Sequence, residues 1–256
     1  MSNMIKILDM TDSEIVDTIQ SGKLNICVIG IGRIGLPTAL SFANSGLPTI
    51  GVDINEKLVE MINSRNFPLN DEPGYDIIFD KVINEKKFKA TTHFSEGVNY
   101  SDVIVLSLPT PMDEKNIPDY SSLLSIAKKL HDEISDGKLI IIESTVEPGF
   151  VENDFLKIIE GDDNKLKLGK NFALGVCPET ANPGQILNDF ERLPRLVGAM
   201  DEHTQNLITK IYKHVFTVEL IPMPNCKTAN AVKLTTNVFR DLNIAFVNEL
   251  ALIFEK

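Results

Sequence analysis

The residues with the clearest capacity for chemistry are three glycines that follow a short apolar run. Gly30, Gly32 and Gly35 have the spacing G-x-G-x-x-G and come directly after the mostly β-branched residues 26–29. In a strand–turn–helix unit, the first glycine allows a tight turn, the second lets a diphosphate approach the backbone, and the third lets the helix pack closely on the strand. The N-terminus of that helix offers free N–H groups to phosphates. The spacing predicts a dinucleotide-binding loop, the alternative being a glycine-rich turn without function.

A carboxylate, Asp53, ends the second apolar run, residues 49–52. At about 20 residues beyond the glycines, a carboxylate can accept hydrogen bonds from a ribose 2′-hydroxyl, and it would repel a 2′-phosphate. We therefore expect NAD rather than NADP as the cofactor. The alternative is that Asp53 is a surface acid at the end of a strand.

Polar residues also follow two later apolar runs, both of which we expect to be buried strands. Thr110 lies between two prolines after residues 102–108, and Glu143 and Thr145 follow residues 138–142. Because ligands of doubly wound sheets bind beyond the carboxyl ends of the strands, these side chains are expected at the ligand-binding edge. The prolines hold Thr110 extended and expose its hydroxyl. A rigid turn with an idle threonine is the alternative reading of this segment.

An amine and an amide, Lys233 and Asn237, lie four residues apart in a segment without internal glycine or proline, residues 225–256, which we expect to form one helix. Side chains at this spacing share one face of a helix. Together they suit a substrate alkoxide or an attacking water molecule. The alternative is a solvated polar stripe.

Strands and helices alternate along the chain, which predicts an α/β fold: a Rossmann-type doubly wound parallel sheet followed by a long central helix. We expect an N-terminal helical extension over residues 1–24, an NAD-binding Rossmann-type domain over 25–222 and the start of the central helix over 223–256. The strands are expected at 26–29, 49–52, 88–92, 102–108, 138–142, 172–176, 195–198 and 215–220. The helices of the domain are expected at 37–43, 55–63, 75–86, 119–134, 151–159 and 201–212.

Composition limits the classes of partner. A net charge of −11 argues against a nucleic-acid or anionic-membrane surface. The three cysteines have no disulfide-framework or metal-ligand spacing, so we expect a reducing compartment and no metal site. No apolar run approaches the length of a membrane span, and the first residues lack a signal-peptide pattern, so a cytoplasmic location is expected.

Five motifs in order resemble those of the UDP-glucose/GDP-mannose dehydrogenase family, the nucleotide-sugar 6-dehydrogenases. They cover nearly the whole chain and read CVIGIGRIGLP from Cys27, LPTP from Leu108, ESTVEPG from Glu143, CPE from Cys177, and the helix motif VKLTTN with RDLNIAFVNEL from Val232 and Arg240. The segment after Glu179, with Pro183-Gly184, together with the helix sequence from Arg240, is most similar to the UDP-N-acetylmannosamine branch of that family.

The resemblance implies a role for each matching residue. Thr110 and Glu179 would hold a catalytic water molecule and handle its proton, while Lys233, aided by Asn237, would stabilise the oxyanion that develops at C6 of the sugar. The family oxidises the C6 alcohol of a UDP-sugar to a carboxylate with two NAD, through an aldehyde, and this branch serves surface polysaccharide biosynthesis. The implied NAD contacts are Gly30, Gly32, Arg33, Ile34, Gly35, Asp53, Pro109, Thr110, Glu143 and Thr145.

The chain departs from the family pattern at its C-terminal end. The family's cysteine nucleophile and its C-terminal domain lie beyond the position at which this sequence ends, so we expect a truncated chain whose own turnover is in question. Neither Cys177 nor Cys226 has the family's nucleophile context, and Cys27 is expected to be buried. Thr180 and Asn230 replace residues usual in the branch. A homodimer through the central helix is expected, as in the family.

Two other functions remain open from the sequence. The 6-phosphogluconate and β-hydroxyacid dehydrogenases also pair a Rossmann domain with a Lys-x-x-x-Asn helix and need no cysteine. Alternatively, the chain is a non-catalytic NAD-binding half of a split enzyme that pairs with a separate polypeptide.

Overall fold

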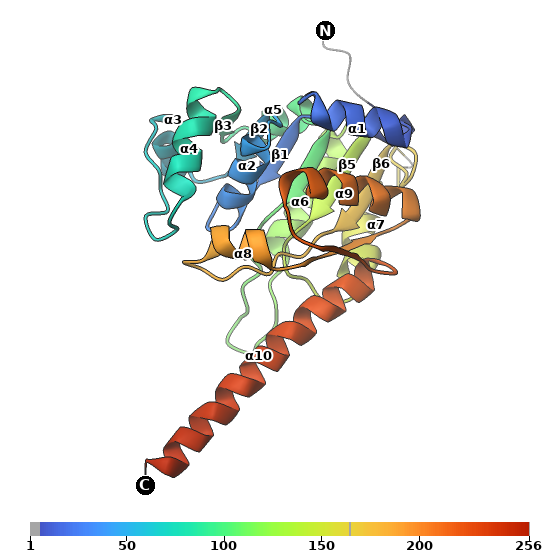
Figure 1. Cartoon of the computed structure of the whole chain (residues 1–256). Coiled ribbons are helices and arrows are strands. Elements are labelled where there is room, and N and C mark those ends of the chain that lie inside the picture. The colour runs from blue at the N-terminus through green and yellow to red at the C-terminus, as the bar shows by residue number, and fades with distance from the viewer. Residues whose placement is uncertain (1–5, 164, 256) are drawn as a thin grey trace.

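The computed structural model describes residues 6–163 and 165–255. Within these residues the chain forms an eight-stranded sheet with the order β3-β2-β1-β4-β5-β6-β7-β8 (Figure 1). The predicted α/β, doubly wound architecture is therefore confirmed. The strands are β1 (Ile26–Ile29), β2 (Thr49–Val52), β3 (Phe88–Thr91), β4 (Val103–Leu106), β5 (Lys138–Ile142), β6 (Phe172–Val176), β7 (Arg195–Ala199) and β8 (Leu220–Pro222).

One strand pair corrects the prediction of a parallel sheet. The pairs from β3 to β6 are parallel and so is β7 with β8, but β6 and β7 pair antiparallel, with Val176 opposite Gly198. The connection between β6 and β7 contains only one short helix, α8 (Ile186–Arg192), and the chain returns along the neighbouring strand. The pattern of apolar residues in a strand carries no information about its direction, so the sequence could not show this reversal.

Helices cover both faces of the sheet, which explains the uninterrupted apolar character of its central strands. Alternate residues of β1 point to opposite sides: Ile26 and Val28 pack in one core cluster, Cys27 and Ile29 in the other. The first face is covered by α1 (Asp12–Gln20), α2 (Gly35–Asn44), α3 (Glu56–Asn63), α4 (Tyr75–Asn84) and α9 (Glu202–Val215). The second is covered by α5 (Phe94–Tyr100), α6 (Ser121–Glu133), η2 (Val151–Phe155), α7 (Leu156–Glu160) and the first turns of α10 (Cys226–Phe254).

Capping residues fix where several helices begin. Thr11 and Glu14 form a capping box at the start of α1: the Glu14 N–H donates to Thr11 Oγ1, and the Thr11 N–H donates to the Glu14 carboxylate at 2.8 Å. Asn225 caps α10 through the N–H of Thr228 at 2.8 Å. The leading segment is a 3-10 turn, η1 (Ile7–Asp9), followed by α1, and residues 1–5 of the predicted extension lie outside the described part of the chain.

One local prediction was wrong, and two short helices were not predicted. Helix α9 continues to Val215, so the strand expected at 215–220 is displaced to β8, because Phe216 packs on Phe42 and Tyr212 rather than entering the sheet. The short helices α5 and α8, of seven residues each, are too brief for a helical period to stand out. The helix expected at 151–159 is confirmed as η2 followed by α7, with the first turn π-helical rather than α-helical.

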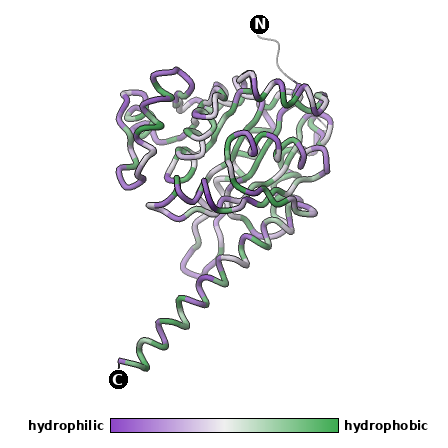
Figure 2. Tube along the Cα trace, in the orientation of Figure 1, coloured by the Kyte–Doolittle hydropathy of each residue, from purple (hydrophilic) through white to green (hydrophobic). Residues whose placement is uncertain are grey.

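Helix α10 leaves the body of the domain. Its first turns pack on β7, β6 and η2, and the remainder projects away from the sheet (Figure 1). The projecting part alternates apolar and polar residues along its length (Figure 2). Its exposed large apolar side chains are Val238, Phe239, Leu242, Ile244, Phe246, Val247, Leu252, Ile253 and Phe254. None of the described helices has the length and apolar character needed to span a bilayer.

Candidate cofactor and catalytic site

A cavity of about 950 Å³ opens at the carboxyl edge of β1, β2, β4 and β5. The register aligns the strand ends, since Ile29 of β1 pairs with Val52 of β2 and Leu106 of β4, and Leu106 pairs with Ile142 of β5. The residues that follow these strands therefore meet at one edge, as the sequence predicted. The predicted site residues in the cavity wall are Gly30, Gly32, Arg33, Ile34, Asp53, Pro109, Thr110, Glu143, Thr145 and Glu179.

The glycine loop has the shape of a diphosphate cradle. Gly30 has φ +86°, and a Cβ there would lie 2.6 Å from the Ser107 carbonyl oxygen. At Gly35 a Cβ would lie only 1.8 Å from the Gly30 carbonyl oxygen, so the turn and the helix touch backbone to backbone. A Cβ on Gly32, by contrast, would meet no atom within 4 Å and would project into open space. The loop thus leaves room for a ligand at the position predicted for a diphosphate.

Helix α2 begins at Gly35, directly after the loop, and no side chain caps its N-terminus. Its first N–H groups and the positive end of its dipole therefore remain free for an anion. Asp53 lies across the loop: its carboxylate accepts hydrogen bonds from the N–H groups of Ile31 at 3.0 Å and Asn55 at 2.9 Å. These bonds hold the half-buried carboxylate at the cavity wall. The fit to a dinucleotide with a free ribose 2′-hydroxyl is good.

The side chain of Arg33 lies at the edge of the cavity and is paired with two acids from the loop before α4. Its guanidinium contacts the Asp71 carboxylate and lies 3.4 Å from that of Glu72. Glu72 is buried and also accepts hydrogen bonds from the N–H groups of Gly184 at 2.6 Å and Ile186 at 3.2 Å. The cofactor loop, the Asp71–Glu72 loop and the segment after Glu179 are therefore joined by polar contacts.

Thr110 connects two strand ends. Its hydroxyl donates a hydrogen bond to the Thr145 carbonyl oxygen at 2.9 Å, while the Leu108 N–H donates to Ser144 Oγ at 2.9 Å. Because the hydroxyl proton of Thr110 is used in this bond, its oxygen is left to accept a hydrogen bond from a ligand or a water molecule.

Glu179 follows β6 at the same edge, and its N–H donates to the Glu143 carbonyl oxygen at 3.3 Å. Its carboxylate accepts the N–H of Ala181. Burial raises the pKa of Glu179 to about 7, and the positive charges of Arg195 and Lys233 oppose that rise. A carboxyl group with this pKa can both accept and donate a proton near neutral pH.

Lys233, two turns into α10, is 7% exposed, and the structure brings its charge within range of Glu179. Burial lowers the pKa of Lys233, and the carboxylate of Glu179 counteracts this. Asn237, one turn further, is exposed to solvent. Among the described residues, neither Lys233 nor Asn237 belongs to the wall of the large cavity, so Glu179 connects that wall to α10.

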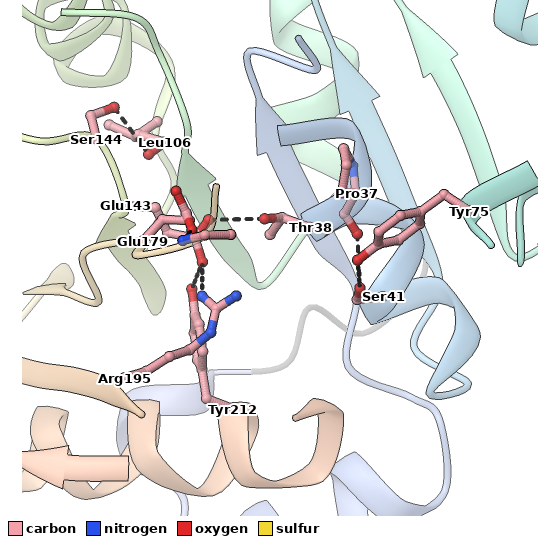
Figure 3. Close-up of polar contacts among 11 residues, drawn as sticks. Pro37, Thr38, Ser41, Tyr75, Leu106, Glu143, Ser144, Glu179, Arg195 and Tyr212 are labelled. Atoms are coloured by element: carbon pink, nitrogen blue, oxygen red, sulfur yellow. Dashed lines mark hydrogen bonds and ion pairs between the residues drawn. The ribbon is translucent and has the colours of Figure 1, made fainter. Parts of the chain in front are cut away.

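The carboxylate of Glu143 lies in a buried network with Thr38, Arg195 and Tyr212 (Figure 3). It accepts hydrogen bonds from Arg195 Nη1 at 3.2 Å, from the Tyr212 hydroxyl at 2.8 Å and from the Thr38 hydroxyl at 3.1 Å. Burial raises the pKa of Glu143, and Arg195 is the strongest opposing influence. The predicted NAD contact of Glu143 is untested, and its side chain already has three protein donors.

The sequence did not single out Arg195, Tyr212 or Thr38 as part of the site. An arginine at the start of an otherwise apolar strand was a usable signal, since a buried arginine needs a partner. The three cysteines, all within the described residues, are buried. Burial raises the pKa of the Cys177 and Cys226 thiols to about 12, and raises that of Cys27 as well.

Curated proteins and solved structures that are similar to this chain over about 90% of its length are nucleotide-sugar dehydrogenases. The UDP-N-acetyl-D-mannosamine dehydrogenase of Campylobacter jejuni is 35% identical over 238 residues, which are 90% of this chain and 57% of the relative. A UDP-D-ManNAc dehydrogenase structure from Pyrococcus horikoshii superposes with a TM-score of 0.83 at 34% identity, covering 90% of this chain and 54% of that one. For a ternary complex of GDP-mannose dehydrogenase from Pseudomonas aeruginosa, the TM-score is 0.82 at 26% identity, with 88% and 51% covered.

The chain spans about half the length of the curated relatives it matches. The NAD-binding domain model of the UDP-glucose/GDP-mannose dehydrogenases matches residues 24–216, which is most of the chain. Together with the glycine loop, Asp53 and the cavity, this match places the protein in the UDP-glucose/GDP-mannose dehydrogenase family, with NAD as its cofactor.

Proposed function

We propose that this chain supplies the NAD-binding domain and part of the catalytic machinery of a nucleotide-sugar 6-dehydrogenase of surface polysaccharide biosynthesis, oxidising the C6 alcohol of UDP-N-acetylmannosamine to a carboxylate. The observation that carries this proposal is the position of Glu179, which lies in the wall of the cofactor cavity and within electrostatic range of Lys233. The similarity to UDP-N-acetyl-D-mannosamine dehydrogenases supports the choice of sugar.

NAD, when bound, accepts a hydride from the sugar carbon. The residues of the chain would stabilise the negative charge that develops on the sugar oxygen and would accept the protons that are released. The ammonium of Lys233, with the amide of Asn237, would stabilise the developing oxyanion. A preorganised donor of this kind is worth roughly 2.7–4 kcal/mol. The carboxylate of Glu179 and the hydroxyl oxygen of Thr110 would hold a water molecule and take its proton.

We further propose that the cysteine needed for the second oxidation comes from a polypeptide segment other than the described residues. Thiolates are the nucleophilic form of cysteine, and the raised pKa values of Cys27, Cys177 and Cys226 keep all three protonated at neutral pH. Their complete burial also denies access to a substrate.

The deciding experiment has two parts. Calorimetric titration should show NAD binding and a clear preference for NAD over NADP. The chain should then form NADH from UDP-N-acetylmannosamine when the segment of the Campylobacter relative that it does not match is supplied in trans, and Lys233→Ala should abolish this activity. NADH formation from small hydroxyacids instead would favour a β-hydroxyacid dehydrogenase. If the chain binds NAD but forms no NADH from any UDP-sugar, the result would favour a non-catalytic NAD-binding module.

We propose that a second copy of this chain covers the exposed apolar side chains of α10. An unpartnered apolar face of this size favours association in water. Sedimentation velocity should show a dimer for the wild type and a monomer for the double variant Leu242→Glu/Phe246→Glu, with Glu249→Gln on the same segment as the control. A wild-type monomer at all concentrations would reject the homodimer.

A further inference from the structure

A buried ion pair lies next to Glu179 and has no part in the chemistry proposed above. It joins Arg195 and Glu143, whose side chains are 2% and 0% exposed. The Arg195 guanidinium also packs over the rings of Phe190 and Phe216, with its central carbon 4.3 and 4.0 Å from their centroids. Because the pair is held by ring packing on Arg195 and by three hydrogen bonds to Glu143, its charges reorient less freely than exposed charges do.

The antiparallel direction of β7 is what brings Arg195 to this edge. Gly175 pairs with Ala199 and Val176 with Gly198, so Arg195, the first residue of β7, lies toward the carboxyl end of β6, the end after which Glu179 follows. In a parallel strand, the first residue would lie at the far edge of the sheet, away from the cofactor. The one reversal within β3 to β7 therefore delivers a positive charge to the carboxyl edge.

The guanidinium has bonding capacity to spare. Arg195 Nη1 donates to Glu143, whereas Nη2 is buried and has no hydrogen-bond partner in the described part of the chain. Three donors and no acceptor face Glu143, which favours its ionised form as the counter-charge. Burial alone would lower the pKa of Arg195, but Glu143, Cys177, Tyr212 and Glu179 together outweigh burial and raise it, with Glu143 the largest of the four.

The charged groups that face Glu179 come from four elements. Arg195 at the start of β7 and Lys233 on α10 favour its ionised form, whereas Glu143 after β5 and Asp189 on α8 oppose it. Arg195 is the strongest of the four influences. The groups that face Arg195 are Glu143, Cys177, Tyr212 and Glu179.

We propose that Arg195 is a positioning residue for Glu179: its guanidinium, anchored by Glu143, is the fixed buried cation beside which the carboxyl group of Glu179 takes up and releases its proton. The inference rests on the proposed function only in treating Glu179 as the group that handles the proton. Glu143 holds the guanidinium of Arg195 in place. Its negative charge also partly neutralises the positive charge of Arg195, which limits how strongly Arg195 favours the ionised form of Glu179.

The test measures the titration of Glu179 directly. The carboxyl carbon of Glu179 is followed by ¹³C NMR in the NAD-free chain, with Glu179→Gln used to assign its signal. In Glu143→Gln the full charge of Arg195 acts on Glu179, and one repelling charge is lost, so the apparent pKa should fall by about one pH unit. In Glu143→Gln/Arg195→Met the pair is removed together, and the apparent pKa should rise by about one pH unit or more above that of Glu143→Gln.

The matched control is Thr38→Val, which removes one hydrogen bond to Glu143 without changing a charge, and should leave the apparent pKa of Glu179 within about 0.3 pH units of the wild type. Circular dichroism melting shows that each variant is folded. The double variant is used in place of Arg195→Met alone, because the single variant would leave the buried Glu143 without a counter-charge and could unfold the chain. Equal apparent pKa values in Glu143→Gln and the double variant would overturn the proposal. Since no substrate is present, that result would leave the proposed dehydrogenase function standing, and a failed UDP-sugar assay would leave this titration unaffected.

Discussion

Replacing Gly32 with alanine should weaken NAD binding while leaving the fold intact. A Cβ at this position meets no atom within 4 Å, and the backbone of Gly32 is not in the left-handed region. Gly-to-Ala replacements under these conditions stabilise a fold by about 0.4–1 kcal/mol. The same methyl group would occupy the space in which a diphosphate approaches the loop. Losing one hydrogen bond between a backbone N–H and a charged phosphate costs about 1.5–3 kcal/mol, which raises the Kd for NAD roughly 10- to 100-fold.

Gly46 provides a matched control, because a Cβ there also meets no atom within 4 Å. It differs in its φ of +97°, which costs an alanine about 1–2 kcal/mol. Gly46 follows the C-terminal end of α2, whereas the cofactor loop precedes its N-terminal end. Gly46→Ala should therefore lower the melting temperature by roughly 2–8 °C and leave the Kd for NAD unchanged.

Calorimetry with NAD and thermal melts without NAD separate the two effects. The expected outcome is a crossed pattern, in which Gly32→Ala weakens NAD binding without lowering stability and Gly46→Ala lowers stability without changing NAD binding. Wild-type affinity in Gly32→Ala would show that the diphosphate is not held at this loop. A drop in melting temperature of Gly32→Ala as large as that of Gly46→Ala would show that the space beside Gly32 is not free.

Three further predictions follow from the site. Asp53→Asn keeps an acceptor for the Ile31 N–H but loses the charge that repels a 2′-phosphate, so the ratio of the NADP and NAD dissociation constants should fall about tenfold or more by calorimetry; an unchanged ratio would count against a role for this carboxylate. Because the pKa of Glu179 is raised from 4.5 to about 7 on folding, the folded chain binds the extra proton, and its unfolding free energy should decline relative to Glu179→Gln as pH rises through this window; parallel urea-unfolding curves at pH 5 and pH 8 would contradict it. The buried cysteines should react with a thiol reagent at pH 8 only after unfolding, and rapid labelling of the native chain would disprove their protection.

The parts of the site that the sequence predicted are those fixed by short-range geometry. The glycine loop, the strand before it and Asp53 are neighbours in one strand–turn–helix–strand unit, and their spacing alone defines the cradle. The strand ends at Thr110 and Thr145 were predictable for a related reason, since parallel strands place their carboxyl ends at one edge. Family membership and NAD follow from the same motifs, whereas the catalytic roles of Lys233, Asn237, Glu179 and Thr110 stay predictions.

The parts that the sequence missed depend on long-range pairing. Arg195 and Glu143 are 52 positions apart, and Thr38 and Glu143 are 105 apart. Nothing in the local sequence of residue 143 tells whether its side chain faces a cofactor or a buried arginine. Arg195 reaches Glu143 because β7 runs antiparallel to β6. That direction depends on the path of the connection between the two strands, which the local sequence does not specify.

The packing of α10 on β7 shows how the same strand joins the cofactor domain to Lys233, the lysine for which we propose a catalytic role. Gly198 is the second-to-last residue of β7, and a Cβ there would come within 2.6 Å of the Asn225 carbonyl oxygen and 2.9 Å of the Ala229 Cβ. Only a glycine lets the first turn of α10 rest directly on the strand. Lys233 follows Ala229 by one turn, so the close contact at Gly198 sets how near its ammonium lies to Glu179. Strand β7 therefore delivers both cations that act on Glu179: Arg195 through its reversed direction, and Lys233 through the glycine that seats the helix.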